Sequence, residues 1–475
     1  MKHDHATFVE EPARSTPVYG SCDVLVIGGG PAGTAAAVAA GRLGADTVLV
    51  ERYNHLGGLS TGGLVSWIDR MTDWDGHLIV AGVGAELIDR CGPDATLGPA
   101  PEIWGSKNPV EAAYWRVRTA ALRETVHWSP TVDPEVLKLV SNDIVRESNV
   151  HTLLHCWVVS AIVRHGSGGA TVEGVIFESK QGRFALMAPV VIDCTGDGDV
   201  FALAGAAFDD DFDGDSAHAR LTTSFRFGNV DMRRYLDFRM LHQEEFTEIM
   251  QRASADGIGL LAHPTPYDSV ALFLTPKMAG YSALNVADLT EVEFVSRDVA
   301  RKGLTFFREN VPGFARAWIL DTASQVGTRH ARRLVGAERI TIEHWRDDGG
   351  YADSIGLCPG MTPSYPDAPD SVSQPASRRH QRSPGRWTQP LGRHQVTRSP
   401  TRDPGMLGHG RSGRRRRNAG DRRWHRPARR RRTRLASPDR EARRRHRPAE
   451  PDGPRQRERR PGLRTRGFDP LASCQ

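Results

Sequence analysis

The chain has few cysteines, and their spacing suggests neither a redox pair nor a metal site. Its 475 residues contain six cysteines, at positions 22, 91, 156, 194, 358 and 474. No two of them are a short step apart, which excludes the cysteine pair of a disulfide-reducing flavoenzyme and the usual ligand sets of a zinc site. Because unpaired thiols are typical of a reducing compartment, we predict a cytoplasmic location.

Long apolar runs are also missing. A membrane-spanning helix needs about 18 or more apolar residues in succession, and no such run occurs, so we predict no membrane span. The N-terminal stretch MKHDHATFVEEPARSTPVYGS has no apolar segment behind its charges. This pattern argues against a secretory signal.

Lysine is absent from the last hundred residues, which differ in character from the rest. Ser371–Gln475 contains 31 arginines, no lysine and 8 acidic residues, a balance of +23. Of the 63 basic and 57 acidic residues in the whole chain, 32 and 49 remain for Met1–Asp370, a balance of −17. Arg, Pro, Ser and Gly dominate the tail and apolar periodicity disappears. Such a composition buries too little surface to offset the entropy of ordering, so we predict disorder there.

Strand and helix patterns alternate before that tail, which favours a doubly wound, Rossmann-like α/β domain followed by a mixed α+β domain. We expect a helix after Asp133, strands near 150–164 and 171–178, and helices near 291–310 and 325–335. The predicted division is an N-terminal extension (1–20), a nucleotide-binding domain (21–208), a substrate-side domain (209–370) and the Arg-rich tail (371–475).

The strongest motif is a glycine turn between the strand CDVLVIG and an alanine-rich helix. Gly28, Gly30 and Gly33 form a G-x-G-x-x-G pattern, in which Pro31 and Ala32 occupy the last two spacer positions. The first glycine permits the tight turn, the second lets a pyrophosphate approach the backbone, and the third lets the helix pack closely. A helix N-terminus also attracts negative charge. This context predicts dinucleotide binding.

An acidic residue follows at the distance that the motif requires. Glu51 stands eighteen residues after Gly33, at the end of the strand DTVLVE, where a carboxylate can accept ribose hydroxyls. Arg52 is next to it. Gly57 and Gly58 follow six and seven residues after the acid, and a second glycine pair there can bring more N–H groups to the phosphates or to a flavin. The alternative reading of this pair is an ordinary surface loop.

A third element is the apolar strand VVID, which runs into a T-G-D-G turn and a helix of small residues. Thr195 and Gly196 therefore lie at the carboxyl end of a strand, where open α/β sheets bind ligands. Asp197 and Asp199 permit a metal-binding reading. We favour it less, because a cation site needs more oxygen ligands than these two carboxylates offer.

Together these segments resemble the FAD-dependent oxidoreductase family, with a fumarate reductase-like, glutathione reductase-type FAD-binding fold. The resemblance rests on five stretches between residues 22 and 360: DVLVIGGGPAG, VERYNHLGGLSTGGLV, VDPEVLKLV, VVIDCTGDGDVFALAGAAF and ASQVGTRHARRLVG.

The resemblance implies FAD as the cofactor and hydride transfer between a small organic substrate and flavin N5. It also implies roles for residues. These are the pyrophosphate for Gly28, Gly30 and Gly33; the ribose for Glu51; the phosphates or flavin for Gly57 and Gly58; the adenine for the Val158 backbone; and the adenosine half for Thr195 and Gly196.

Three arginines in TRHARRLVG are candidates for substrate binding. Arg329 and Arg333 are four residues apart and would share a face of a helix, with Arg332 beside them. A guanidinium suits a carboxylate substrate. Ion pairs on a solvated helix explain the cluster equally well, and His330 is more readily structural than catalytic. The sequence therefore identifies no catalytic residue.

The tail lacks the segment that the resemblance leads us to expect, a string close to REIPECWATGEAAG before a flavin-covering helix. However, codons can be chosen for Thr401–Arg414, TRDPGMLGHGRSGR, that yield all fourteen residues of that string when read one base later. We therefore predict that the tail is the family's C-terminal segment translated out of frame, with the shift between Met361 and Thr401. A poorly covered flavin would then bind weakly.

Two other readings remain open. The tail is alternatively a basic arm for nucleic acid. That reading is weaker, because the segment has no lysine and only Trp387, Trp424 and Phe468 for base stacking. The chain is alternatively a non-catalytic remnant that retains the nucleotide-binding fold.

Overall fold

A five-stranded sheet, four strands of which are parallel, organises the first half of the protein. The computed structural model describes residues 9–167, 169–210, 221–336, 354–359, 371–375 and 395–398. The sheet has the order β24 (Gln395–Arg398), β12 (Val190–Asp193), β2 (Val24–Ile27), β3 (Thr47–Val50) and β8 (Val150–Leu153). β12, β2, β3 and β8 run parallel, and β24 is antiparallel to β12 at the edge. The apolar sequences of the central strands β2 and β3 match the burial of both faces.

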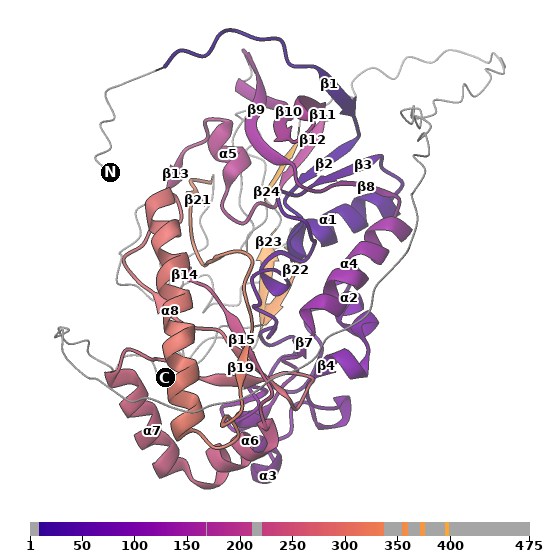
Figure 1. Cartoon of the computed structure of the whole chain (residues 1–475). Coiled ribbons are helices and arrows are strands. Elements are labelled where there is room, and N and C mark those ends of the chain that lie inside the picture. Colours follow the sequence, from indigo (N-terminus) through magenta and orange to yellow (C-terminus); the bar gives the residue numbers. More distant parts are fainter. Residues whose placement is uncertain are drawn as a thin grey trace, which may run out of the picture. The chain divides into compact units, whose positions relative to one another are not determined.

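Helices cover one face of this sheet (Figure 1). They are α1 (Pro31–Arg42), α2 (Val83–Cys91) and α4 (Pro134–Glu147). Val26 and Leu49 point to this side and pack with apolar residues of α1 and α4. α4 begins after Asp133, whose carboxylate accepts hydrogen bonds from the N–H groups of Glu135 and Val136 at 2.8 and 2.9 Å. This cap places the helix start as expected.

A second sheet covers the other face. Its order is β1 (Val18–Ser21), β11 (Gly182–Met187), β10 (Gly169–Ser179) and β9 (Trp157–Gly166). Leu25 and Ile27 of β2 pack with Val175, Phe177 and Leu186 of this sheet. The first half thus has three layers, and the predicted Rossmann-like α/β fold with a parallel sheet is confirmed. A second sheet takes the place of the helices that a doubly wound fold carries on this face.

Short elements connect β3 to α4 and β12 to the second half. They are η1 (Gly58–Ser60), η2 (Pro93–Ala95), η3 (Pro101–Ile103), α3 (Pro109–Arg116), β4 (Thr96–Leu97), β5 (Ala121–Leu122), β6 (Thr125–Val126), β7 (Thr131–Val132) and α5 (Asp199–Leu203).

Within residues 221–336, the second half contains a four-stranded antiparallel sheet and three helices. The sheet order is β16 (Ala262–Pro264), β17 (Val270–Phe273), β15 (Phe225–Gly228) and β19 (Trp318–Thr322). The helices are α6 (Met232–Leu241), α7 (Gln243–Ala255) and α8 (Val286–Asn310). The predicted helix at 291–310 lies within α8, which begins after the capping side chain of Asn285.

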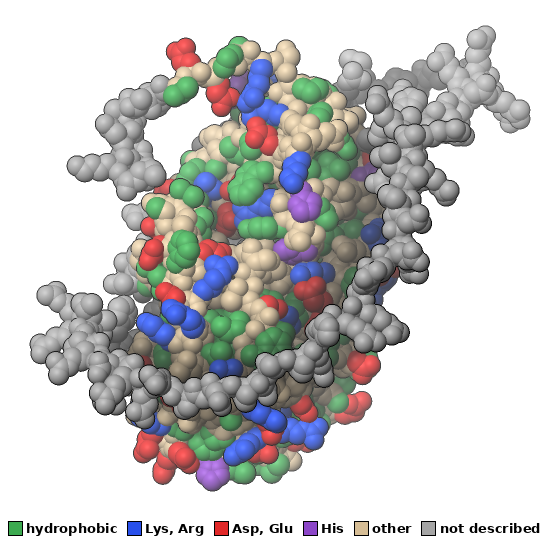
Figure 2. Space-filling view, in the orientation of Figure 1, with side chains coloured by type: hydrophobic (Ala, Val, Ile, Leu, Met, Phe, Trp, Pro, Cys, Tyr) green, Lys and Arg blue, Asp and Glu red, His purple; other side chains and the backbone are tan. Residues whose placement is uncertain are grey.

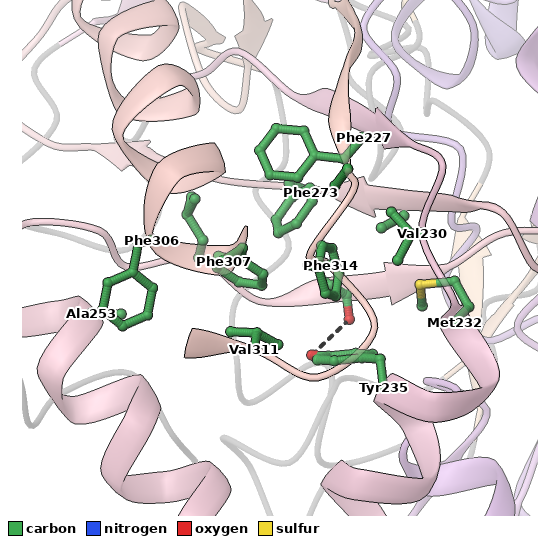
Figure 3. Close-up of a cluster of buried hydrophobic side chains, with 14 of the residues drawn as sticks. Phe227, Val230, Met232, Tyr235, Ala253, Phe273, Phe306, Phe307, Val311 and Phe314 are labelled. Carbon is green, nitrogen blue, oxygen red and sulfur yellow. Dashed lines mark hydrogen bonds between the residues drawn. The ribbon is translucent and has the colours of Figure 1, made fainter. Parts of the chain in front are cut away.

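Aromatic side chains fill the core between this sheet and its helices (Figure 3). Phe227, Phe273, Phe307 and Phe314 are fully buried, with ring centroids of neighbouring pairs 4.7–6.4 Å apart. Tyr235 is also fully buried, and its hydroxyl donates to the carbonyl of Ala262 at 3.4 Å. Burying aromatic rings is a large source of stability.

The prediction of a helix at 325–335 is wrong. This segment instead forms β20 (Gly327–Thr328), which pairs with β14 (Leu221–Thr222), and β21 (Arg333–Leu334), which pairs with β13 (Phe208–Asp209). β14 also pairs with β18 (Lys277–Met278). Pairing with distant strands here overrides a helical pattern of only a few residues.

Most of the Arg-rich tail, including Thr401–Arg414, lies outside the described residues. Two short strands are described within the stretch for which we predicted disorder, β24 and β23 (Ser371–Pro375). β23 pairs with β22 (Ser354–Pro359). Within the described part of the chain, no helix combines the length and apolar character of a membrane span.

Basic and acidic side chains are interspersed on the face shown in Figure 2. Several arginines form ion pairs at the surface, such as Arg42 with Glu86 and Arg90 with Glu147. Exposed pairs of this kind contribute little to stability.

Candidate functional site

The glycine turn between β2 and α1 is shaped by close backbone contacts. Gly28 has a φ of 98°, and a Cβ there would lie 2.4 Å from the carbonyl oxygen of Cys194. A Cβ on Gly33 would lie 1.7 Å from the carbonyl oxygen of Gly28. Around Gly30, in contrast, the nearest atom to such a Cβ is 4.0 Å away. The first and third glycines are therefore required by packing, whereas the second has open space beside it.

The N-terminus of α1 faces this open space without a side-chain cap. Gly30 is its N-cap residue, Pro31 is the first helical residue, and the first turn contains no acidic side chain. The N–H groups of a helix start carry partial positive charge. The turn and the helix together can therefore hold an anion.

Glu51 is buried at the end of β3 and braces the turn from the other side. Only 6% of the surface of this residue is exposed. One carboxylate oxygen accepts the Gly29 N–H at 2.5 Å, and the other accepts the Tyr53 N–H at 2.8 Å. Each oxygen has a second lone pair, so the carboxylate can accept ligand hydroxyls while it holds the backbone.

The second glycine pair lies directly against the first turn. The N–H of Gly57 donates to the carbonyl of Gly29 at 2.8 Å. A Cβ on Gly58 would stand 2.8 Å from the Cα of Gly30. Both glycines have positive φ, 88° and 51°. The structure thus brings together two segments that are almost thirty residues apart in sequence.

A pocket opens at the carboxyl ends of β2 and β3. Its lining combines residues from both strands, from β9 and from the turn after β12: Ile27, Gly28, Val50, Glu51, Arg52, Cys156, Trp157, Val158, Thr195 and Asp199. Five residues chosen from the sequence are in this lining, namely Gly28, Glu51, Arg52, Val158 and Thr195.

The turn after β12 is held by Asp193, which the sequence reading missed. Its carboxylate accepts the N–H and hydroxyl of Thr195 at 3.1 and 2.7 Å, and the N–H groups of Val200 and Phe201 at 3.0 and 3.1 Å. Burial raises the pKa of this fully buried carboxyl group. An acid that immediately precedes a strand-ending turn was the available signal.

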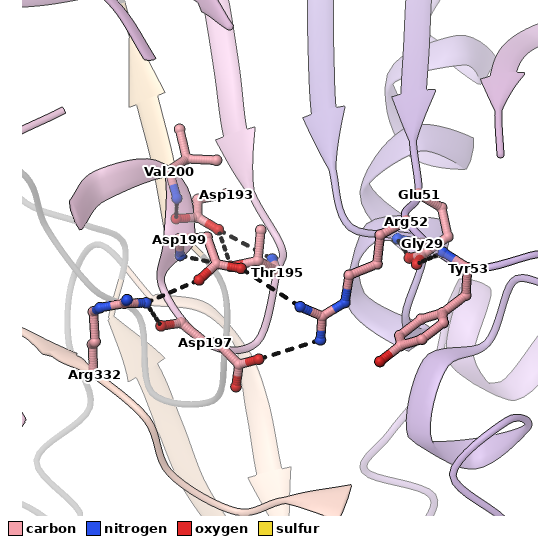
Figure 4. Close-up of polar contacts among 10 residues, drawn as sticks. All are labelled: Gly29, Glu51, Arg52, Tyr53, Asp193, Thr195, Asp197, Asp199, Val200 and Arg332. Atoms are coloured by element: carbon pink, nitrogen blue, oxygen red, sulfur yellow. Dashed lines mark hydrogen bonds and ion pairs between the residues drawn. The ribbon is translucent and has the colours of Figure 1, made fainter. Parts of the chain in front are cut away.

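Two arginines approach this turn from opposite sides (Figure 4). Arg52 lies 3.5 Å from the carboxylate of Asp197 and 3.9 Å from that of Asp199. Its guanidinium is also 5.0 Å from the ring centroid of Tyr53 and 5.2 Å from that of Trp157. Burial alone would lower the pKa of Arg52, but Tyr53 and the two carboxylates outweigh it and raise the pKa.

Arg332 is the second of these arginines. It donates to the Asp199 carboxylate at 2.9 Å and to the Asp197 carbonyl at 3.1 Å. Asp197 and Asp199 thus face arginines. Among the described residues, no three His, Cys, Asp or Glu side chains gather to hold a metal ion.

The three candidate substrate arginines do not share a helix face. Arg329 and Arg333 are exposed, and they lie in the extended segment that replaces the predicted helix. Arg332 instead reaches back to the pocket. The expected spacing argument fails because residues four apart align only on a helix.

The sequence drew attention to His330, which is exposed, whereas His127 is buried and His263 is half-buried. His127 and His263 have pKa values lowered to about 4, mainly by burial. His127 contacts the hydroxyl of Ser129 at 2.8 Å, and His263 stacks on Trp67. Single histidines without a motif gave no sequence signal.

The glycine turns, the buried acid and the pocket at the strand ends agree with a family comparison. The model of the FAD dependent oxidoreductase family matches residues 23–366. The chain belongs to this family. Membership confirms the predicted resemblance and FAD as the cofactor.

Solved structures show only distant similarity. THI4 from Thermovibrio ammonificans is 16% identical, with a TM-score of 0.28, over 40% of this chain and 65% of that one. A geranylgeranyl bacteriochlorophyll reductase-like protein from Thermoplasma acidophilum is 16% identical, with a TM-score of 0.34, over 65% and 66%. The p-nitrophenol 4-monooxygenase PnpA from Pseudomonas putida is 12% identical, with a TM-score of 0.34, over 67% and 70%. The chain thus spans just under two thirds of the first two proteins.

Proposed function

We propose that the pocket binds the adenosine diphosphate half of FAD and that the chain transfers hydride between a small organic substrate and the flavin. One observation carries this proposal: an uncapped glycine turn is joined to a buried acid at the mouth of a pocket. FAD would supply the hydride-accepting ring. The chain would supply binding and orientation.

Each part of the pocket suits one part of the nucleotide. The open side of Gly30, with Ala32 and Gly33 at the start of α1, suits the diphosphate. The free lone pairs of Glu51 suit the ribose hydroxyls. Val158 and Thr195 line the pocket, and Gly196 follows Thr195 in the same turn; we assign the Val158 backbone, Thr195 and Gly196 to the adenosine half.

The second glycine pair would hold the next part of the cofactor. Gly57 and Gly58 contact the first turn, so a ligand at Gly30 would also meet their backbone. We assign them to the phosphates or the flavin end. Arg329 and Arg333 remain candidates for an anionic substrate, whereas the contacts of Arg332 favour a role on the cofactor side. The unpaired cysteines still favour the cytoplasm.

We propose further that the Arg-rich tail is translated out of frame and that this copy binds flavin weakly. The argument is the lysine-free composition and the fit of Thr401–Arg414 to the expected string. Sequencing the gene from an independent isolate tests it. An unbroken frame, with the Arg-rich tail present in the protein by mass spectrometry, would refute the proposal.

Binding of FAD tests the proposed function itself. The full chain and a frame-corrected version are purified, titrated with FAD and followed by flavin absorbance and fluorescence. We expect weak uptake of FAD by the full chain with its Arg-rich tail and a yellow, stoichiometric complex for the frame-corrected version. A preparation of the full chain that carries one FAD per molecule would contradict impaired binding. Failure of the folded, monodisperse corrected version to take up FAD contradicts the proposed function.

The two alternatives predict different outcomes. A non-catalytic remnant would bind FAD without reduction of the flavin by any small organic donor. A nucleic-acid-binding arm would give salt-sensitive retention on DNA or RNA that a chain ending near residue 370 lacks.

A further inference from the structure

We infer that Arg332 is a positioning residue for the cofactor, acting through the Asp199 carboxylate that it shares with Arg52 and through the Asp197 backbone carbonyl. The inference rests on the proposed function, because it assumes a diphosphate-bearing ligand in the pocket. It concerns a residue that comes from the second half of the chain, more than 130 positions after the turn that it contacts.

The contacts form one continuous chain of charges. Arg52 lies beside Asp197 and Asp199, and Arg332 binds the same two residues from the other side. All four side chains are partly buried, with 17–31% of each exposed. Figure 4 shows the two guanidinium groups on either side of the turn.

The net charge of these four side chains determines how the loss of Arg332 would affect an anionic ligand. Two carboxylates and two guanidinium groups sum to zero at the edge of a pocket that would receive a diphosphate. Without Arg332 the remaining three groups sum to −1. The Glu51 carboxylate in the same lining adds to this negative charge, so an anionic ligand is repelled. Repulsion between partly exposed charges is screened by salt, so its effect is greatest at low ionic strength.

The position of Arg52 depends on the same carboxylates. Its guanidinium stands over Tyr53 and Trp157, within the lining of the pocket. Arg332 orients Asp199 through its shortest contact, and the Asp199 N–H is fixed by the Thr195 hydroxyl at 3.0 Å. Arg332 therefore fixes the position of Asp199, and through it of Arg52, at the mouth of the pocket without contacting the ligand.

Binding of ADP to the full chain tests this inference. ADP probes the adenosine half alone, so the measurement does not depend on how the flavin ring is covered. Calorimetric titrations compare the parent chain with Arg332→Met and Arg332→Lys at 20 mM and 500 mM NaCl. Arg301→Met is the matched control, because it removes an exposed arginine on α8 that pairs only with Asp298 in the contacts seen.

The charge argument makes specific predictions. Arg332→Met weakens ADP binding by about five- to tenfold at low salt, and the defect shrinks at high salt. Arg332→Lys restores most of the salt-dependent part, because it retains the charge while losing the two-pronged contact. Arg301→Met binds ADP like the parent, and melting temperatures show that the variants remain folded.

Other outcomes separate failure of the inference from failure of the proposed function. If the parent binds ADP and Arg332→Met binds it equally well, the positioning role is wrong. A defect that is independent of salt, not rescued by lysine and accompanied by a lowered melting temperature would show a purely structural role. If the folded parent itself binds no ADP, the proposed function fails and the role of Arg332 falls with it.

Discussion

The nucleotide-binding half and the substrate-side half are built from contacts of different range. In the first half, short strings mark the site: the glycine turn before α1 and the acid after β3, where the Glu51 carboxylate accepts the Gly29 N–H. In the second half, the core gathers phenylalanines from β15, β17, α8 and the segment after it. Local contacts make a recognisable motif, whereas distant packing leaves only apolar residues in the sequence. This is why the cofactor end is readable and the substrate end is not.

Removing an aromatic ring from the second half gives the largest expected effect. Phe307 is fully buried among other rings. Phe307→Ala should lower the free energy of unfolding by about 3–5 kcal/mol, because it leaves a cavity. Urea unfolding measures this loss. Phe307 is not in the lining of the pocket, so ADP affinity of the remaining folded protein should stay at the parent value. A parallel loss of ADP binding would break the comparison.

A methyl group on the third glycine of the turn, Gly33, should destabilise the nucleotide-binding half and abolish ADP binding. The Cβ of Gly33→Ala would overlap the Gly28 carbonyl, so α1 or the turn must move. We expect a loss of stability of about 3 kcal/mol and no detectable ADP binding. Gly44→Ala is a control outside the packed turn, since nothing lies within 4 Å of its Cβ position. Its positive φ, 85°, still implies a small cost. An unchanged ADP affinity in Gly33→Ala would contradict the turn's role.

Acid should destabilise both halves through one histidine in each, the buried His127 and the half-buried His263. The pKa values of His127 and His263 are lowered from 6.5 to about 4 by burial. Between these values the unfolded chain binds more protons than the folded one. The stabilising contribution is therefore complete above pH 6.5 and is lost as the pH falls towards 4. Urea unfolding across this range in the parent, His127→Gln and His263→Gln should show shallower pH dependence in each variant. Identical slopes would rule out the burial effect.

Substituting the buried acid should have the smallest effect on stability and a clear effect on the ligand. Glu51→Gln retains one acceptor for two N–H donors, so one backbone group loses its partner. We expect a cost of about 1–2 kcal/mol in stability and about tenfold weaker ADP binding, measured by urea unfolding and calorimetry. Glu86→Gln, at an exposed ion pair on α2, is the matched control. Equal ADP binding by both variants would remove Glu51 from the site.

The sequence predicted the strands of the parallel sheet, the glycine turn and the acid after β3, because each is marked by a short string of characteristic residues. It misplaced Arg329, Arg332 and Arg333, because the pairing of β20 and β21 with remote strands decides their conformation. It also missed Asp193, whose partners become visible only when the turn folds back on it. Long-range pairing and burial of single polar side chains are therefore what the sequence conceals.

Equilibrium binding of ADP to the full, folded chain tests the central claim most directly. The account predicts saturable binding at one site, lost in Gly33→Ala and weakened in Glu51→Gln, even if the flavin end of the cofactor is poorly held. A folded chain that shows no heat of binding with ADP up to millimolar concentration would contradict it.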